Sequence, residues 1–401
     1  MKLLHLAALG IAALGASIVM AAASQQNRTS AVRDRVQPDR PLDASTPSGL
    51  VVVLVNDPGK TLDVTPLSNP AISGAALQIH WSDIEPNGPA KGPSDWSRIE
   101  AVLSAARASK KWVQLLIFPG FFSPSWALKG VEQDVFPLQY GPGHKEGVKL
   151  PLPMPWDPVY LKRWSAFVKR LSVKFGGDSA LRVVDAAGPT SVSAEFTLPG
   201  TPPDLVLWKK HNYTPTKYIE AWKQVFQTYA ADFPNQFVSL SLGSGIRIND
   251  KGQSGPREPK LVQTEVVDEA SAILGSRFVL QGSNLDGVPS TATSMATTFV
   301  IGYNGRAVTG FQLRTSCLKA SANMGAAADP RLAMTRSFDN GMQPGKSGGH
   351  VNYIEVYYPD VVPEMQSALN DGAARFSGAS IPRRPPNVPK KPSRGTRTPP
   401  G

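Results

Sequence analysis

Two glutamates in or next to apolar strand candidates offer a pair of carboxyl groups for acid–base chemistry. Glu195 lies in the loop GPTSVSAEFTLP after one apolar segment, and Glu355 lies inside another, between Ile354 and Val356. Cleavage of a glycosidic bond needs one carboxyl group that protonates the departing oxygen and a second that attacks the sugar or activates water. The two glutamates fit this reaction, with Glu195 as general acid/base and Glu355 as nucleophile or second base.

Amide and aromatic side chains lie at the ends of the same apolar segments. Sugar rings stack their apolar faces on aromatic rings and present hydroxyl groups to amides and carboxylates, so such residues are typical of a carbohydrate site. The predicted substrate-binding residues are Gln78, His80, Trp81, Trp126, Trp156, Asn284, Gln312 and Tyr357. Other interpretations remain open. The tryptophans could be core residues, and Glu195 could be a solvated loop acid. His80 could be a lumen residue whose hydrogen bonds are satisfied within the protein.

Eight apolar segments alternate with helical stretches, which is the pattern of parallel α/β units. The segments cover residues 50–57, 74–81, 112–118, 181–188, 237–245, 277–284, 308–316 and 351–360. In six of them polar and apolar residues alternate, which gives the strand one polar face. Strands of an open sheet covered on both sides are more often apolar throughout. We therefore predict an α/β fold, a single-domain (β/α)8 TIM barrel over residues 47–378, with a doubly wound open sheet as the alternative.

The helix that precedes the strand before Glu195 is the clearest helix in the sequence. Its apolar residues recur every three or four positions; they are Leu161, Trp164, Phe167, Val168, Leu171 and Phe175. Asp157 and Pro158 suit its first turn, and Gly176–Gly177 closes it with residues that permit a left-handed exit. Similar patterns predict helices over residues 93–111 and 214–233.

Two stretches of the sequence resemble secreted clan A glycoside hydrolases, especially the β-galactosidase-like and cellulase-like members. The segment HWSDIEPNGPAKGPSDWSRIEAVLSAARASKKWVQLLIFPGFFSPSWA looks like their second and third βα units. MPWDPVYLKRWSAFVKRL together with GPTSVSAEFTLP looks like the unit that presents the general acid/base, which maps onto Glu195. The likeness covers about Gly49 to Phe376. It implies a (β/α)8 barrel that hydrolyses O-glycosyl bonds.

The sequence departs from that family at both catalytic positions. Ala194 stands where clan members usually have an Asn, and the seventh strand carries Gln312 and Arg314 where the nucleophile is expected. Glu355 falls on the eighth strand, opposite the fourth, so its separation from Glu195 could exceed the roughly 5 to 5.5 Å of retaining enzymes. If the first apolar segment is only a lead-in, Glu355 moves to strand seven and Glu195 to strand three.

The two ends of the chain differ in composition from its middle. Residues 1–23 have a positive start, an apolar run and small residues before Ser24, as in a secretory signal peptide, so we expect an exported protein, periplasmic or extracellular. An uncleaved signal anchor is the alternative. Residues 24–46 read as a linker, and residues 379–401 as a basic, Pro-rich disordered tail. Cys317 is the only cysteine, which excludes an intramolecular disulfide.

No cofactor and no metal ion are predicted. The chain lacks a phosphate-binding loop and a dinucleotide fingerprint, and its five histidines show no metal-ligand spacing. Lys2 and the basic residues of the tail account for more than half of the net charge of +11, so we expect no nucleic-acid partner. We expect a monomer whose partner is an oligo- or polysaccharide substrate. The basic tail could also make weak contact with an anionic envelope surface. The alternatives are a noncatalytic carbohydrate-binding barrel and an envelope scaffold.

Overall fold

The computed structural model describes residues 46–55, 61–138, 147–346 and 348–377. The predicted signal peptide, the linker up to residue 45 and the tail lie outside the described residues, as do Asn56 and Asp57 at the end of the first predicted strand. Within the described ranges, no helix is long and apolar enough to cross a membrane.

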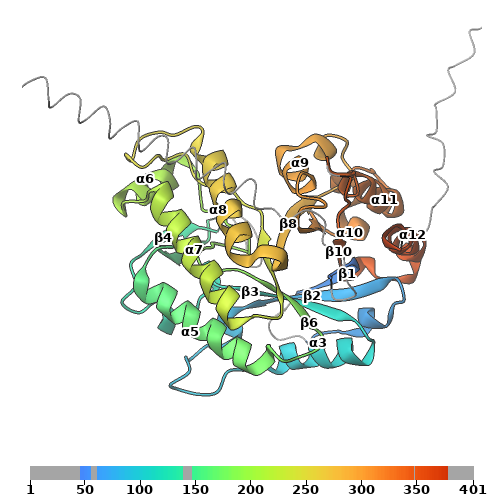
Figure 1. The fold of residues 1–401 in the computed structure, drawn as a ribbon, viewed down its shortest axis with the longest axis horizontal. Coiled ribbons are helices and arrows are strands. Elements are labelled where there is room, and N and C mark those ends of the chain that lie inside the picture. Colours follow the sequence, from blue (N-terminus) through green and yellow to red (C-terminus); the bar gives the residue numbers. More distant parts are fainter. Residues whose placement is uncertain (1–45, 56–60, 139–146, 347, 378–401) are drawn as a thin grey trace, which may run out of the picture.

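Eight parallel strands form a closed barrel within the described part of the chain, in the order β1-β10-β9-β8-β7-β6-β3-β2 (Figure 1). They are β1 Gly49–Val55, β2 Ile72–His80, β3 Trp112–Phe118, β6 Leu181–Asp185, β7 Phe237–Ser241, β8 Phe278–Leu285, β9 Val308–Leu313 and β10 Tyr353–Tyr357. The predicted TIM barrel is confirmed, and the open sheet is excluded. Because β1 pairs with both β2 and β10, it is a barrel strand and not a lead-in. Glu195 therefore follows the fourth barrel strand, and Glu355 lies on the eighth.

Helices surround the barrel and cover the outer faces of its strands (Figure 1). The helices are α2 Trp81–Ile84, α3 Ser97–Ala108, α4 Ser125–Leu128, α5 Pro158–Phe175, α6 Pro202–Lys210, α7 Pro215–Asp232, α8 Glu258–Leu274, α9 Met295–Ile301, α10 Cys317–Ala320, α11 Pro330–Gly341 and α12 Gln366–Phe376. A small antiparallel pair, β4 Gln133–Pro137 and β5 Lys149–Pro153, lies between β3 and α5 in the chain. Cys317 is buried, as befits a structural thiol.

Helix α5 forms as its sequence predicts, with one difference at its end. Asp157 caps the first turn, since its Oδ1 accepts a hydrogen bond of 2.8 Å from the backbone N–H of Tyr160. The six apolar residues of the predicted stripe are all buried, so packing against the barrel stabilises the helix. The expected left-handed exit is wrong: Gly176 has a φ of −62° and ends the helix in the right-handed region. A Cβ there would lie 2.7 Å from the carbonyl oxygen of Ser172, so close approach is what favours glycine.

The inner faces of the strands form a core of their own, separate from the layer between strands and helices. Its apolar members are Val51, Val53, Ala76, Trp112, Leu116, Phe118, Val183, Ala194, Val279, Val308 and Tyr353. Polar side chains project among them, as the period-two alternation predicted. Gln114, Ser239, Gln281 and Glu355 are all buried. The barrel thus has an inner face in which polar groups are enclosed by apolar ones.

Candidate active site

Glu195 lies in the loop that follows β6, close above the inner core. The side chain is half-buried, and its Oε2 accepts a hydrogen bond of 2.8 Å from the hydroxyl of Ser193. Ala194 is buried within the inner core, so the chain enters the barrel mouth just before the glutamate. Active sites of such barrels lie at the carboxyl ends of the strands, which is where this carboxylate stands.

Glu355 lies deeper, on the inner face of β10, and has no exposed surface. In register it stands beside Val51 of β1 and Gln312 of β9. The amide of Gln281 donates a hydrogen bond of 2.9 Å to its Oε1. A carboxyl group must touch the sugar to attack it, and the full burial of Glu355 prevents that contact in this conformation.

A chain of hydrogen bonds links Glu355 to a second buried acid, Asp185 of β6. Gln114 donates to Asp185 Oδ1 over 2.9 Å and to Gln281 Oε1 over 2.8 Å. Gln281 then donates to Glu355, while the hydroxyl of Tyr353 donates to Gln281 Oε1 over 2.6 Å. Two acids on opposite sides of the lumen are thereby connected through two amides.

Burial makes proton binding favourable in this chain of polar groups. Loss of solvent raises the pKa of Glu355 well above its usual range, and the neighbouring Asp185 raises it further. Burial also raises the pKa of Asp185 to about 7, although hydroxyl and amide donors oppose the shift. Burial therefore favours the protonated form of Glu355 more than that of an exposed glutamate. A carboxyl group in its protonated form is neither a nucleophile nor a base.

Tyr357 lies between the two predicted catalytic glutamates. It is the last residue of β10, points to the same side as Glu355 and retains some exposed surface. Burial raises the pKa of its phenol, and the nearby carboxyl groups of Glu355 and Glu195 add to this rise. Both glutamates therefore lie within electrostatic range of one phenol at the mouth of the barrel.

On β2, Gln78 and His80 share the inner face with Ala76, as predicted. The ring of His80 stacks on that of Phe122, with centroids 3.9 Å apart and planes at 6°. Its Nδ1 lies 3.5 Å from Asp83 Oδ2. Burial lowers the pKa of His80 and Asp83 opposes that shift, so the imidazole is neutral at neutral pH.

The predicted tryptophans lie in the aromatic layer behind the barrel wall rather than in its lumen. Trp81 has no exposed surface, so it cannot stack on a sugar in this structure; its indole N–H donates to Glu85 Oε2 over 3.2 Å. Trp126 packs edge-on against Trp81 and donates to the backbone oxygen of Glu85 over 2.6 Å. Glu85 also forms a buried ion pair, since Arg170 Nη2 lies 2.7 Å from its Oε2.

The remaining predicted residues divide between mouth and periphery. Trp156 packs against Trp208 and Tyr213 beside the start of α5. Asn284 is exposed near the end of β8, whereas Gln312 is 8% exposed on the inner face of β9. The structure thus brings Gln78, His80, Gln312 and Tyr357 to the inner face with the glutamates. It does not bring the tryptophans there.

Sequence reasoning missed Asp185, Tyr353 and Phe122. Asp185 lies two residues after Val183 in a predicted strand, so the alternation that selected the other polar residues also points it inward. Phe122 had no such signal, because it belongs to the short 3-10 helix η2 Gly120–Phe122 after β3. Only the folded chain brings it over His80.

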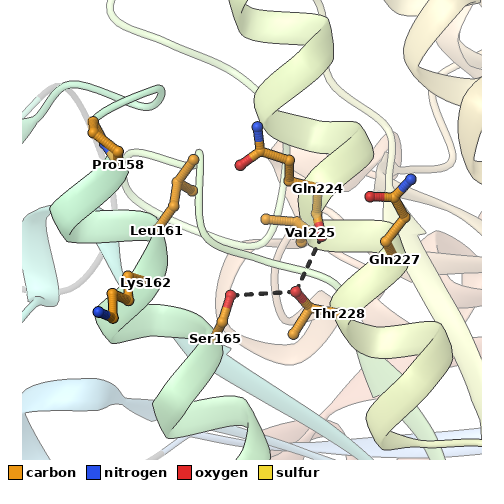
Figure 2. A pocket seen from close by; sticks show the side chains of 8 residues that line it. All are labelled: Pro158, Leu161, Lys162, Ser165, Gln224, Val225, Gln227 and Thr228. Atoms are coloured by element: carbon orange, nitrogen blue, oxygen red, sulfur yellow. Dashed lines mark hydrogen bonds between the residues drawn. The ribbon is translucent and has the colours of Figure 1, made fainter.

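A groove on the outside of the barrel wall has no member of the predicted site. Figure 2 shows it between α5 and α7, where the hydroxyls of Ser165 and Thr228 lie 3.2 Å apart and Thr228 also donates to the backbone oxygen of Gln224. Lys162 and Gln227 are among its other lining residues. None of its lining residues carries a carboxyl group.

Comparison with solved structures identifies proteins that share this fold. The catalytic domain of β-amylase from Paenibacillus polymyxa matches 84% of this chain and 100% of its own, with a TM-score of 0.55 and 9% identity. The chain has the barrel fold of that domain. An endo-1,4-β-mannanase from Eisenia fetida matches 82% of this chain and 92% of its own at 12% identity, with a TM-score of 0.45. A scan against protein-family models and a search of curated proteins gave no match.

Proposed function

We propose that the chain is an exported glycoside hydrolase that binds an oligo- or polysaccharide across the barrel mouth. The observation that carries this proposal is the position of Glu195. It follows the fourth barrel strand, retains exposed surface and lies near Tyr357 and the polar inner face. Glycoside hydrolases with this barrel fold are known, as the β-amylase domain illustrates. Glu195 would act as general acid/base, giving its proton to the departing oxygen.

Gln78, Gln312 and Tyr357 would bind sugar hydroxyls on the side facing Glu195. Glu355 would supply the second carboxyl group. Because Glu355 is covered and burial favours its protonated form, the two-carboxylate mechanism requires that substrate binding open a path from Glu355 to the sugar and to solvent, which takes its proton.

A noncatalytic carbohydrate-binding barrel is the second candidate, and the full burial of Glu355 favours it. The test is hydrolysis of a panel of aryl glycosides and oligosaccharides by the wild type and by Glu195→Gln and Glu355→Gln. A hydrolase releases product, and both substitutions reduce its rate. Binding of glycans without product from any panel member would replace the hydrolase with the binding protein.

Export rests on the composition of residues 1–23. The mature protein should begin near Ser24, and its intact mass, measured after isolation from the periplasm or medium, checks this directly. A mass that retains the first 23 residues in a membrane fraction would support the signal anchor instead.

A further inference from the structure

Two rings from neighbouring barrel units form a stacked pair at the mouth. His80 ends β2, and Phe118 pairs with it in register at the end of β3. Phe122 follows in η2 and places its ring 3.9 Å from that of His80 at an angle of 6°. The His80 side chain is 13% exposed, and Phe122 is half-buried. Both rings therefore retain surface at the end of the barrel where Glu195 lies.

The loop that carries Glu195 is tied to the helical turn that carries Phe122. The backbone N–H of Phe121 donates to the carbonyl oxygen of Ser191 over 3.0 Å. Gly120 has a φ of +61°, and a Cβ on it would lie only 2.2 Å from that same oxygen. The hydroxyl of Ser191 in turn donates to the carbonyl oxygen of Thr197, which closes the loop around Glu195. The stacked rings and the carboxylate are thus held by one connected set of backbone contacts.

Acidic groups lie near these rings. Asp83 lies beside His80, and the carboxyl group of the half-buried Glu195 acts on the phenol of Tyr357 at the same mouth. His80 itself is neutral at neutral pH. An anionic sugar would be repelled at this mouth, because like charges in a partly buried site are poorly screened. An uncharged sugar ring meets no such penalty.

We propose that His80 and Phe122 form a ring-binding subsite beside Glu195, which takes uncharged pyranose residues through their apolar C–H faces. The inference rests on the proposed carbohydrate site and goes beyond it by naming the binding surface and the substrate class. The ring surface that the stacked pair leaves exposed buries the apolar face of the sugar, and the connected loop fixes its position relative to the Glu195 carboxylate.

Binding and hydrolysis of neutral oligosaccharides with gluco, manno and galacto configurations are measured for the wild type, Phe122→Ala and Phe122→Trp. Calorimetry gives Kd, and the rates give kcat and KM. Loss of the ring should weaken binding about tenfold or more, the range of an aromatic contact at the centre of a binding site. Phe122→Trp should stay within a few-fold of the wild type, because it keeps an aromatic face. Met295→Ala, at a side chain 82% exposed in α9, is the control. Thermal unfolding confirms that each variant is folded.

Each result decides a different part of the proposal. A folded Phe122→Ala with unchanged Kd and KM overturns the subsite even if the chain hydrolyses sugars. The wild type could bind the sugars, Phe122→Ala could fail to bind them, and neither protein could hydrolyse them. That result supports the subsite and overturns the proposed hydrolase. Tighter binding of oligouronates than of their neutral counterparts contradicts the proposed substrate class, and failure of the wild type to bind any neutral oligosaccharide overturns the subsite.

Discussion

At the scale of single residues, the site combines a carboxyl group at the surface with two that are enclosed. Glu195 is half-buried at the mouth, whereas Asp185 and Glu355 are almost completely buried below it. The carboxyl groups differ in how readily they ionise, because loss of solvent disfavours the charged form of Asp185 and Glu355. Glu195 can exchange protons with a substrate directly. Glu355 takes part only if its surroundings change.

The buried pair should make the free energy of unfolding depend on pH. Folding raises the pKa of Asp185 to about 7 and that of Glu355 well above its usual range, so the folded chain retains protons that the unfolded chain releases. The resulting stability is fully present below about pH 4 and is lost as pH rises, by up to about 1.4 kcal/mol per pH unit for each such group. Denaturant unfolding at pH 5, 6 and 7 should show a flatter dependence in the Asp185→Asn/Glu355→Gln double variant. If the free energy of unfolding changes with pH equally in the variant and the wild type, the two buried acids are not the cause of the pH dependence.

Glu85 provides a contrasting buried acid. It is 2% exposed and pairs with Arg170, whose Nη2 lies 2.7 Å from its Oε2. Glu85→Gln should lower the free energy of unfolding at pH 7 by roughly 1 to 3 kcal/mol, since an ion pair is lost from a buried position. At Glu355 burial favours the protonated acid, which the amide of Glu355→Gln resembles, so this change should cost less at the same pH. The reverse order of the two costs would contradict this difference between the two acids.

At the scale of elements, the sequence predicts what depends on local pattern. The apolar segments gave the eight barrel strands, and the alternation of Gln114, Gln281 and Glu355 with apolar neighbours gave the inner face. Phe122 and the links from its turn to the Glu195 loop could not be predicted, because those contacts join residues about 70 positions apart in the chain. The prediction that the tryptophans face the lumen was wrong for a related reason. A ring at a strand end can turn either to the lumen or to the helices, and the fully buried Trp81 turns to the helices.

The turn that links the two loops can be tested with a matched pair of glycines. Gly120 and Gly130 have φ values of +61° and +72°, but only at Gly120 would a Cβ clash, with the backbone of Thr190 and Ser191; at Gly130 nothing lies within 4 Å. Gly130→Ala should cost about 1 to 2 kcal/mol from backbone strain alone. Gly120→Ala should cost more and also weaken sugar binding, because the turn must move away from the Glu195 loop. Equal losses of stability in the two variants, measured by denaturant unfolding, would argue against this coupling.

At the scale of the whole molecule, a barrel with a modest charge is flanked by segments of different composition. The basic residues of the tail are Arg383, Arg384, Lys390, Lys391, Arg394 and Arg397, with no acid between them. A basic segment attracts anionic polymers and lipids by charge, and salt weakens that attraction. The barrel would then carry the chemistry, and the tail would determine where in the envelope the protein resides.

Deletion of residues 379–401 should release the protein from the envelope fraction while leaving the hydrolysis rate and the unfolding temperature unchanged. High salt should release the full chain to the same extent, because both treatments remove the same electrostatic attraction. Fractionation followed by immunoblotting measures the distribution. Retention of the shortened chain at low salt would assign the envelope contact to the barrel instead.

If Glu195 gives its proton to the departing oxygen, as we propose, its substitution must affect substrates according to their leaving group. An acidic phenol departs without a proton, whereas an alkyl or sugar oxygen needs one. Glu195→Gln should therefore reduce kcat/KM by about 10²- to 10⁴-fold for a poor leaving group, the range of general acid catalysis. The loss should be much smaller for an activated aryl glycoside of the same sugar. Equal losses for both substrates, or no loss for either, would contradict the assignment.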